Sequence, residues 1–236
     1  MPPESATWTA SIGQVVKRIL LPVAVLFGVM VALGLLVTKV WAHDWPFTAE
    51  DAINRDFAAH RDGALNAVSE FFSLMGSTPV VVGITAAVAI GLRLKLHRWR
   101  EPLLLCAAVS AQALVFLFTT LVIDRRRPAV PHLDDSPPTS SFPSGHTSAA
   151  VALYVGLAVV LAVLLKKTWA KRLAWLFVLV PVLVATARLY RGMHHPSDVT
   201  ASFLNGLACV AIMVRSILDR AVRWARPVFT KSAVPA

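Results

Sequence analysis

The sequence contains little cysteine and few acidic residues. Only two cysteines occur in 236 residues, Cys106 and Cys209, and both lie inside apolar runs. They form neither a disulfide framework nor a pair of metal-binding thiols. The 13 acidic residues are outnumbered by 23 lysines and arginines, so the formal net charge is +10. Nucleic-acid binding would require a basic face on a soluble fold, and the hydrophobicity of the chain argues against such a fold.

A signal-peptide cleavage pattern is also missing. The first long apolar run follows the basic pair Lys17 and Arg18 and is not closed by small residues, so we expect it to be retained as a membrane span. Hydrophobic residues make up 56% of the chain, and the mean hydropathy is +0.65. Soluble domains contain roughly 45–50% apolar residues even when glycine is counted. These values indicate an integral membrane protein.

Six segments approach the length of about 20 mostly apolar residues that a transmembrane helix needs. The sequence therefore predicts an all-α, six-transmembrane-helix bundle in one domain, residues 1–236, without internal repeats. The spans are expected near 19–40, 71–92, 102–123, 144–165, 168–187 and 199–217. Residues 48–68 predict an outer amphipathic helix, which would either lie on the membrane surface or cover the bundle. Residues 226–236 are expected to be a loose tail.

The distribution of charge predicts the orientation. Lysines and arginines gather before the first span, in the links between spans two and three and between spans four and five, and in the tail. All of these fall on one side of a six-span bundle, and that side should be cytoplasmic together with both termini. Five arginines break this rule on the outer side and predict an anion site there. They are Arg125, Arg126, Arg127, Arg188 and Arg191.

Two outer segments have features suited to phosphate. Thr119–Pro128 places arginines at the end of span three, although arginines in such a place more often snorkel or contact lipid headgroups. Ser140–Ser148 contains Pro-Ser-Gly-His where span four begins. The amides at such a helix N-terminus favour an anion, and a glycine allows close approach of the backbone. An N-cap followed by an interfacial histidine would explain the second segment equally well.

The third outer segment, Ala187–Val199, links spans five and six. It contains two arginines, two histidines and an aspartate. Asp198 would be favourable at a helix start for its charge alone. A carboxylate near a histidine can also hold the imidazole in one tautomer and stabilise its cation. Ionisable groups near membrane depth are functional candidates, so the three segments together predict an active site at the outer face.

These residues resemble the three-part signature of the type 2 phosphatidic acid phosphatase family, Lys-x6-Arg-Pro, Pro-Ser-Gly-His and Ser-Arg-x5-His-x3-Asp. Arg127-Pro128 matches the end of the first part. Residues 143–146 match the second part in full. Arg188, His194 and Asp198 match the third at the family spacing, whereas His195 does not. The family lysine falls on Thr120 and the serine before the arginine on Ala187. Thr120 offers no charge, and Arg125 or Arg126 would have to supply it.

The resemblance implies a phosphatase that works through a phosphohistidine. His194 is the expected nucleophile, Asp198 orients it, and His146 protonates the leaving oxygen and then activates water. The expected phosphate ligands follow. They are Arg127, Arg188, Ser144, Gly145, Thr120 and Arg125. No metal or other cofactor is implied, and no paired-carboxylate or His/Cys spacing demands a metal.

The expected substrate is a membrane lipid phosphate, with the bilayer itself as the other partner and no nucleic acid. Polyprenyl pyrophosphate (such as undecaprenyl pyrophosphate), phosphatidic acid and phosphatidylglycerol phosphate are the candidates that the family implies. The extra arginines favour a diphosphate slightly. The compact form and the resemblance indicate a bacterial inner membrane. Two alternatives stay open, a phosphotransferase on the same fold and a lipid transporter or scaffold without catalysis. The sequence does not predict the oligomeric state.

Overall fold

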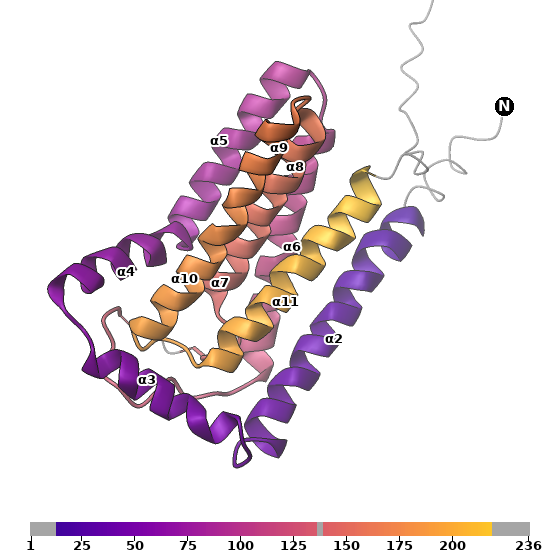
Figure 1. Cartoon of the computed structure of the whole chain (residues 1–236). Coiled ribbons are helices and arrows are strands. Elements are labelled where there is room, and N and C mark those ends of the chain that lie inside the picture. The colour runs from indigo at the N-terminus through magenta and orange to yellow at the C-terminus, as the bar shows by residue number, and fades with distance from the viewer. Residues whose placement is uncertain (1–12, 136–138, 219–236) are drawn as a thin grey trace, which may run out of the picture.

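The computed structural model describes residues 13–135 and 139–218. These residues form helices and connecting loops and contain no strand. Six helices are long and apolar enough to cross a membrane. They cover Gly13–Val40, Thr78–Leu96, Arg100–Val122, Gly145–Leu164, Thr168–Tyr190 and Pro196–Leu218. The predicted all-helical, six-span architecture is thereby confirmed (Figure 1). The predicted tail at 226–236 lies outside the described residues.

Several spans combine more than one helical type without a break in the chain. The first consists of η1 (Val16–Leu20), α2 (Leu21–Leu35) and η2 (Leu36–Val40), and the second and third are α5 (Thr78–Leu96) and α6 (Arg100–Val122). The fourth consists of α7 (Gly145–Ala150), η4 (Val151–Val155) and α8 (Gly156–Leu164). The fifth consists of α9 (Thr168–Ala174), η5 (Trp175–Val178) and α10 (Leu179–Tyr190), and the sixth of α11 (Pro196–Met213) and η6 (Val214–Leu218).

The second span begins later than the sequence predicts. A separate helix, α4 (Gly63–Met75), precedes it, and the chain turns at Gly76 and Ser77 before α5 starts. Pro79 lies in the first turn of α5, where its missing N–H costs no hydrogen bond. A Cβ at Gly76 would lie 2.7 Å from the carbonyl oxygen of His146. The turn between α4 and α5 therefore brings the start of α5 into direct contact with the start of span four.

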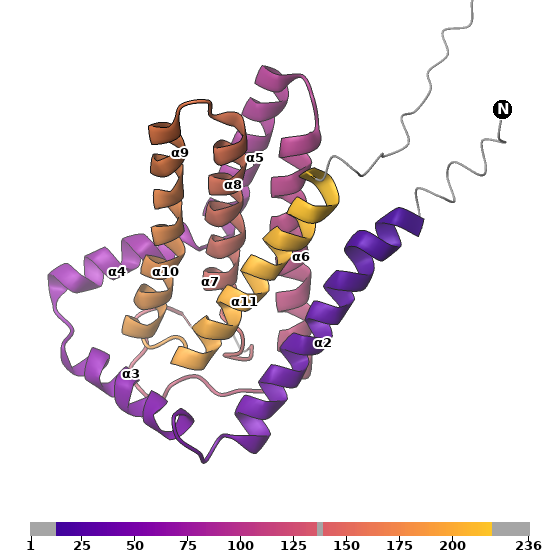
Figure 2. The ribbon, with the colours of Figure 1, turned by 45° about the vertical axis from the view of Figure 1, so that its right-hand side comes forward.

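Span four lies at the centre of the bundle. All five residues of η4 and three of the six in α7 are buried, because α6, α10 and α11 pack around them. Its side chains contribute to both apolar clusters of the core, with Val151 in one and Leu153 in the other. By contrast, α2 lies at the side of the bundle and packs against α6 and α11 (Figure 2). The central position of span four gives a rigid base to the residues at its N-terminus.

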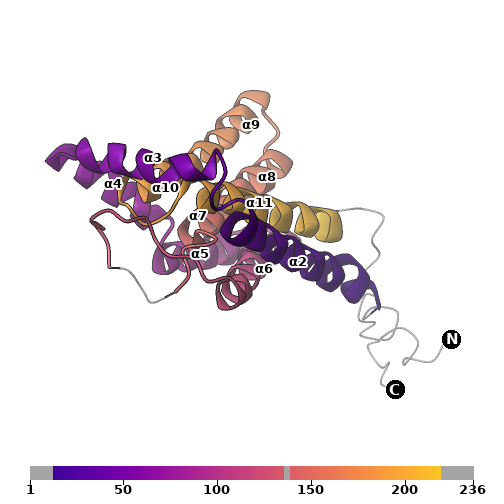
Figure 3. The ribbon, with the colours of Figure 1, turned by 90° about the horizontal axis from the view of Figure 1, so that it is seen from below.

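The predicted amphipathic segment forms parts of three helices at one end of the bundle. These are η3 (Phe47–Ala49), α3 (Glu50–Ala59) and the first part of α4. Viewed from below, α3 crosses over α10 (Figure 3). The side-chain amide of Asn54 donates to the carbonyl oxygens of His194, at 3.1 Å, and Leu189, at 3.4 Å. These contacts place α3 against α10 at this end of the bundle.

The two ends of the bundle carry different loops. The links between α5 and α6 and between α8 and α9 lie at the end opposite to α3 (Figure 2). These links contain the cationic clusters around Arg98 and Lys167. Figure 2 also shows that the described parts of the link between α6 and α7, residues 123–135 and 139–144, and the turn between α10 and α11 lie at the same end as α3. The three segments with the predicted chemistry therefore share one end of the molecule.

Candidate active site

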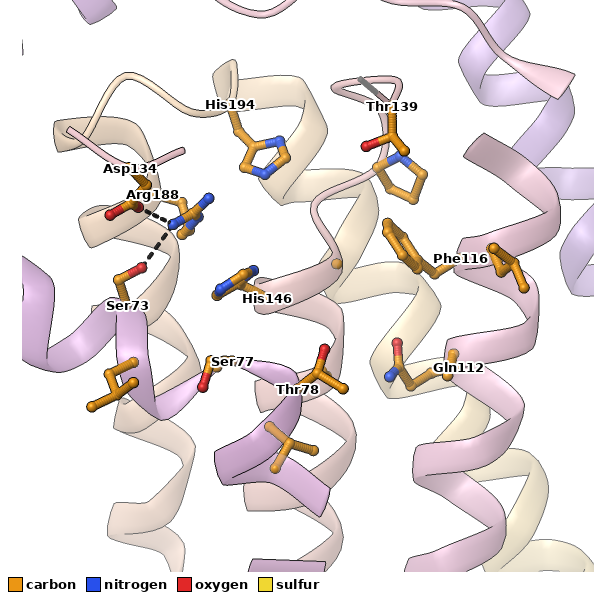
Figure 4. Close-up of a pocket in the computed structure, with 18 of the residues that line it drawn as sticks. Ser73, Ser77, Thr78, Gln112, Phe116, Asp134, Thr139, His146, Arg188 and His194 are labelled. Atoms are coloured by element: carbon orange, nitrogen blue, oxygen red, sulfur yellow. Dashed lines mark hydrogen bonds and ion pairs between the residues drawn. The ribbon is translucent and has the colours of Figure 1, made fainter. Parts of the chain in front are cut away.

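A cavity of about 620 Å³ opens at the end of the bundle that carries α3 and α4. Five of the predicted site residues line it. They are Arg127, Gly145, His146, Arg188 and His194. They come from the loop after α6, the first turn of α7, the end of α10 and the turn before α11. The fold thus gathers residues that lie up to 67 positions apart in the sequence, from 127 to 194. Both imidazoles point into the cavity (Figure 4).

His194 is buried, and its surroundings select one tautomer. Its Nδ1 lies 2.8 Å from the carbonyl oxygen of Ser141, which can only accept a hydrogen bond, so Nδ1 carries the proton. Nε2 then keeps its lone pair, as a nucleophile must. Burial away from water lowers the pKa of His194 from 6.5 to about 4; the carboxylate of Asp198 opposes the shift and the charge of Arg188 adds to it. His194 is therefore neutral near pH 7.

Asp198 is fully buried in the first turn of α11 and accepts several hydrogen bonds. Its Oδ2 accepts from the hydroxyl of Ser141 at 2.6 Å and from the amide of His195 at 2.8 Å, and its Oδ1 accepts from Arg125. The closest approach to His194 is 3.8 Å, between Oδ2 and Nδ1. The Ser141 carbonyl therefore makes the direct bond to His194, and the carboxylate acts on the ring through its charge and through Ser141.

The start of span four supplies His146 and Gly145. Ser144 is the N-cap of α7, and its hydroxyl accepts from the amide of Thr147 at 3.4 Å. The amide of Ser144 donates to the hydroxyl of Ser202 at 2.7 Å, so this amide is directed at span six and not at the cavity. Gly145 does line the cavity, and a Cβ there would lie 2.8 Å from the ring of Phe116. Only Gly145 of the two predicted backbone ligands faces the cavity.

Arg127 and Arg188 bring positive charge to the cavity wall. Nη1 of Arg127 donates to the carbonyl oxygen of Met193 at 2.8 Å, and Nη1 of Arg188 donates to the hydroxyl of Ser73 at 2.7 Å. Burial lowers the pKa of Arg127, and the charge of Asp198 opposes this shift. The Nε groups of both arginines are buried and have no hydrogen-bond partner in the described part of the chain. Buried polar groups are rarely left unpaired, so these two donors indicate an anionic ligand.

Asp134 is a site residue that the sequence analysis missed. It lines the cavity, and its carboxylate pairs with both Arg188 and Arg191. Burial alone would raise the pKa of Asp134, but the hydrogen bond from Arg191 and the charge of Arg188 outweigh burial and lower it. Asp134 is therefore ionised and holds Arg188 in place from one side (Figure 4). No motif marks it in the sequence, where it is one of two aspartates in a polar loop.

The remaining predicted residues lie outside the cavity. The hydroxyl of Thr120 donates to the carbonyl oxygen of Leu117 in its own helix, and Ala187 is buried in α10. Arg125 pairs with Glu50 and Asp198, and Arg126 is exposed. None of these four lines the cavity. Across residues 13–135 and 139–218, no group of three or more His, Cys, Asp or Glu side chains is arranged to hold a metal ion.

The sequence and the fold are both similar to those of known proteins. A model of the PAP2 superfamily matches residues 101–221, which include Arg127, His146, Arg188, His194 and Asp198. No curated protein matches the sequence. Two solved structures share the fold.

One is the first transmembrane PAP2-type phosphatidylglycerolphosphate phosphatase from Bacillus subtilis. It is 23% identical with a TM-score of 0.71, over 86% of this chain and 98% of its own. The other is LpxE from Aquifex aeolicus, which is 23% identical with a TM-score of 0.57, over 72% of this chain and 97% of its own.

Proposed function

Because the chain belongs to the PAP2 superfamily, we propose that it is an integral-membrane lipid phosphatase, which hydrolyses a phosphate monoester or a pyrophosphate of a membrane lipid. One observation carries the proposal. His194, with a free Nε2, shares a cavity with His146 and with Arg127 and Arg188, whose buried Nε groups have no hydrogen-bond partner in the described part of the chain. A nucleophile, a proton donor and an anion site are the parts that phosphoryl transfer needs.

The lining of the cavity suits an amphiphile. Away from the arginines and histidines, the wall between α4, α5 and α6 is mostly apolar, with Glu70, Ser77, Thr78 and Gln112 as its polar members. Its apolar part is formed by Leu74, Val81, Val82, Val109, Ala113, Phe116 and Leu117. Leu74, Val82 and Leu117 are about half exposed at the surface of the bundle, at 55%, 56% and 49%. A lipid tail would lie along these side chains while its phosphate reached Arg127 and Arg188, so we assign the substrate to the membrane lipids.

In the first step, Nε2 of His194 attacks phosphorus, and the bond from phosphorus to the lipid oxygen breaks. His146 gives a proton to that oxygen, so the lipid leaves as an alcohol or, from a pyrophosphate, as a monophosphate. Arg127, Arg188 and the backbone at Gly145 stabilise the charge on the equatorial oxygens. The charge of Asp198 stabilises the imidazole as it becomes cationic.

In the second step, water attacks the phosphohistidine and gives a proton to His146. The bond from phosphorus to nitrogen breaks, inorganic phosphate leaves, and His194 returns to its neutral form. Both histidines thus end in their starting state. The scheme needs no metal ion, because the two guanidinium groups supply the positive charge.

The structure bears on the choice between lipid monophosphates and diphosphates. Two of the three arginines that favoured a diphosphate, Arg125 and Arg191, are paired with carboxylates of the protein. The third, Arg126, is exposed and outside the cavity. We therefore give phosphatidic acid and phosphatidylglycerol phosphate equal weight with undecaprenyl pyrophosphate as substrates in cell-envelope lipid metabolism. We place the protein in a bacterial inner membrane with the cavity facing outward.

The test is phosphate release by the purified protein in detergent with EDTA present. The three lipids are offered in parallel, and the His194→Ala protein serves as the blank. We expect release that depends on His194 and falls about 10²–10⁴-fold without His146. Asp198→Asn should keep the fold and lose most of the activity. His60→Ala is a matched control, because His60 is an exposed histidine at the far end of α3.

Three outcomes would contradict parts of the proposal. Wild-type turnover by His194→Ala would rule out the phosphohistidine. Loss of lipid phosphate without accumulation of free phosphate would indicate a phosphotransferase. No reaction of any lipid with the folded protein would favour the transporter or scaffold.

A further inference from the structure

Two consecutive ion pairs connect the outer helix α3 to the carboxylate of Asp198. Glu50, the first residue of α3, binds Nη2 of Arg125 through its Oε2 at 2.6 Å. Nη1 of Arg125 donates in turn to Oδ1 of Asp198. The other oxygen of Glu50 accepts from the backbone amide of Ser197 at 2.6 Å, and Ser197 also receives a bond from Arg125 at 2.7 Å. Arg125 is 75 residues from Glu50 and 73 residues from Asp198 in the sequence, so these ion pairs join three distant segments.

Glu50 and Asp198 are buried at the two ends of this series of ion pairs, and Arg125 between them is largely buried. The exposed fractions of the side chains are 7% for Glu50, 13% for Arg125 and 0% for Asp198. Removing one partner of a buried charge pair is costly, because the other charge is left without compensation. A guanidinium is planar and offers its donors in a fixed fork. Arg125 is thus held at both ends, by Glu50 on one side and by Asp198 on the other.

The position of Arg125 determines which oxygen of Asp198 faces His194. With Oδ1 occupied by Arg125, Oδ2 is the oxygen that lies 3.8 Å from Nδ1 of His194. The same Oδ2 accepts from the hydroxyl of Ser141, whose carbonyl oxygen binds the His194 proton. Rotation of the carboxylate would break this arrangement and move the charge away from the ring that becomes cationic.

We propose that Glu50 and Arg125 are positioning residues, which fix the carboxylate of Asp198 and thereby complete the active site from the outer helix α3. The inference rests on the proposed phosphatase function. It assigns Arg125 a role different from the phosphate contact that the sequence suggested, and it agrees with the position of Arg125 outside the cavity. Glu50 has no counterpart among the motif residues.

A second contact from α3 supports the same connection. Nε2 of His195 lies 3.4 Å from Oδ1 of Asp51, and Nδ1 of His195 lies 3.3 Å from Oδ2 of Asp198. Asp51 is half exposed, at 52%, so this contact is weaker than the buried pair. Two neighbouring residues of α3 therefore reach Asp198, one through Arg125 and one through His195.

The test measures kcat and KM separately for Arg125→Gln and Glu50→Gln, each made alone and together with Asp198→Asn. We expect Arg125→Gln to lower kcat by about 10²-fold, the loss typical of a small misplacement of a reacting group, and to change KM less than about twofold. Glu50→Gln should lower kcat by a smaller factor. In the Asp198→Asn background neither change should reduce kcat further, because both residues act through that carboxylate.

Asp56→Asn is the matched control on the same helix. Asp56 is exposed and pairs with His60, away from Asp198, so its loss should leave kcat and KM unchanged. Hydrogen exchange of the segment 193–199 gives a readout that needs no substrate. The amide of His195 donates to Asp198, and we expect it to exchange faster in Glu50→Gln than in Asp56→Asn. Glu50→Gln also keeps the inference testable if Arg125→Gln does not fold.

Several results would overturn the inference. A rise in KM with unchanged kcat, or an equal further loss in the Asp198→Asn background, would make Arg125 a phosphate ligand. If kcat, KM and hydrogen exchange were unchanged in both Arg125→Gln and Glu50→Gln, neither residue would position Asp198. These results differ from failure of the proposed function, in which the wild-type protein itself releases no phosphate from any lipid.

Discussion

At the scale of single residues, the surroundings of His194 suit it to nucleophilic attack. The Ser141 carbonyl oxygen holds the proton on Nδ1, at 2.8 Å, and so leaves Nε2 free. Burial disfavours the charged ring, and the arginines that would bind phosphate add to this effect. The neutral form is the one that can attack phosphorus. The nearby charge of Asp198 becomes useful only when the ring gains positive charge, which happens in the transition state.

This environment leads to a prediction about pH. The pKa of His194 is lowered from 6.5 to about 4, so the nucleophile should stay neutral until the pH falls to about 4. We expect the acidic limb of kcat/KM that belongs to His194 to lie near pH 4 and not near 6.5. A titration of the 15N-labelled imidazole, assigned with His194→Ala, would check the value in the free protein. An acidic limb of kcat/KM near pH 6.5, together with a His194 pKa near 6.5 in the titration, would show that the imidazole is exposed to water and would contradict the prediction.

The same shift has a consequence for stability. The folded protein disfavours the charged imidazole, whereas the unfolded chain protonates it near its usual pKa of 6.5. Stability should therefore decrease as the pH falls below 6.5, and the loss that is due to His194 should level off near pH 4. The lowered pKa of Asp134 acts in the same direction but at lower pH, because its stabilising charge is lost only on protonation.

Residue types and spacings predicted some contacts and not others. His146, His194 and Arg188 can be recognised because their motif fixes their separation along the chain. Arg127 is recognisable as well, because Pro128 follows it and Arg-Pro ends the first part of the signature. Nothing in the sequence shows that Arg125, two positions earlier, lies outside the cavity. The difference arises from Glu50, which is 75 residues away and draws Arg125 toward α3. Asp134 went unnoticed for a similar reason, since only the fold places it beside Arg188 and Arg191.

At the scale of helices, close contact between spans four and six holds His146 and Asp198 near each other. Gly206 in α11 lies against Val151 in η4, where an added Cβ would be 2.5 Å from Val151 Cβ and 2.9 Å from the carbonyl oxygen of Ser148. Small residues allow such close approach of membrane helices. His146 lies at the start of span four and Asp198 at the start of span six, so this contact sets the distance between them.

We therefore expect Gly206→Ala to destabilise the protein and to lower its activity. Overpacking of a filled interior costs typically about 1–3 kcal/mol, and here the helices must separate because neither neighbouring atom is at the end of a flexible chain. Gly83→Ala is the control, since a Cβ at Gly83 in α5 meets nothing within 4 Å. Thermal unfolding in detergent and phosphate release would be measured for both. Equal midpoints for the two variants would contradict the close packing.

The helix boundaries show which features of the fold can be predicted from apolar segments of the sequence and which cannot. Mostly apolar runs located five of the spans, because burial in lipid requires about 20 apolar residues whatever the neighbours are. Their expected ends lie within three residues of the observed ones, except that the first span was expected to begin at 19 and is described from Gly13. The second span was displaced, with 71–92 expected and Thr78–Leu96 observed. Its start depends on the contact between Gly76 and the carbonyl oxygen of His146, which is a tertiary interaction that hydropathy does not register.

At the scale of the whole molecule, charge and chemistry lie at opposite ends of the bundle. One end carries the cationic links around Arg98 and Lys167, and the other carries α3 and the cavity. Cytoplasmic loops of membrane proteins are enriched in lysine and arginine. Three of the arginines at the cavity end, Arg125, Arg188 and Arg191, are each paired with a carboxylate of the protein, whereas Arg126 is exposed. The bundle should therefore insert with its cavity outward.

This orientation can be tested in intact cells with single added cysteines. Trp45 is 83% exposed in the loop between η2 and η3, and Lys167 is exposed in the link between α8 and α9. With Cys106 and Cys209 replaced by serine, a membrane-impermeant thiol reagent should label Trp45→Cys in intact cells. It should label Lys167→Cys only after the cells are opened. The reverse pattern would place the cavity in the cytoplasm and make the substrate a lipid of the inner leaflet. Labelling of both variants in intact cells would contradict a membrane-spanning bundle, because the two sites lie at opposite ends of the apolar helices.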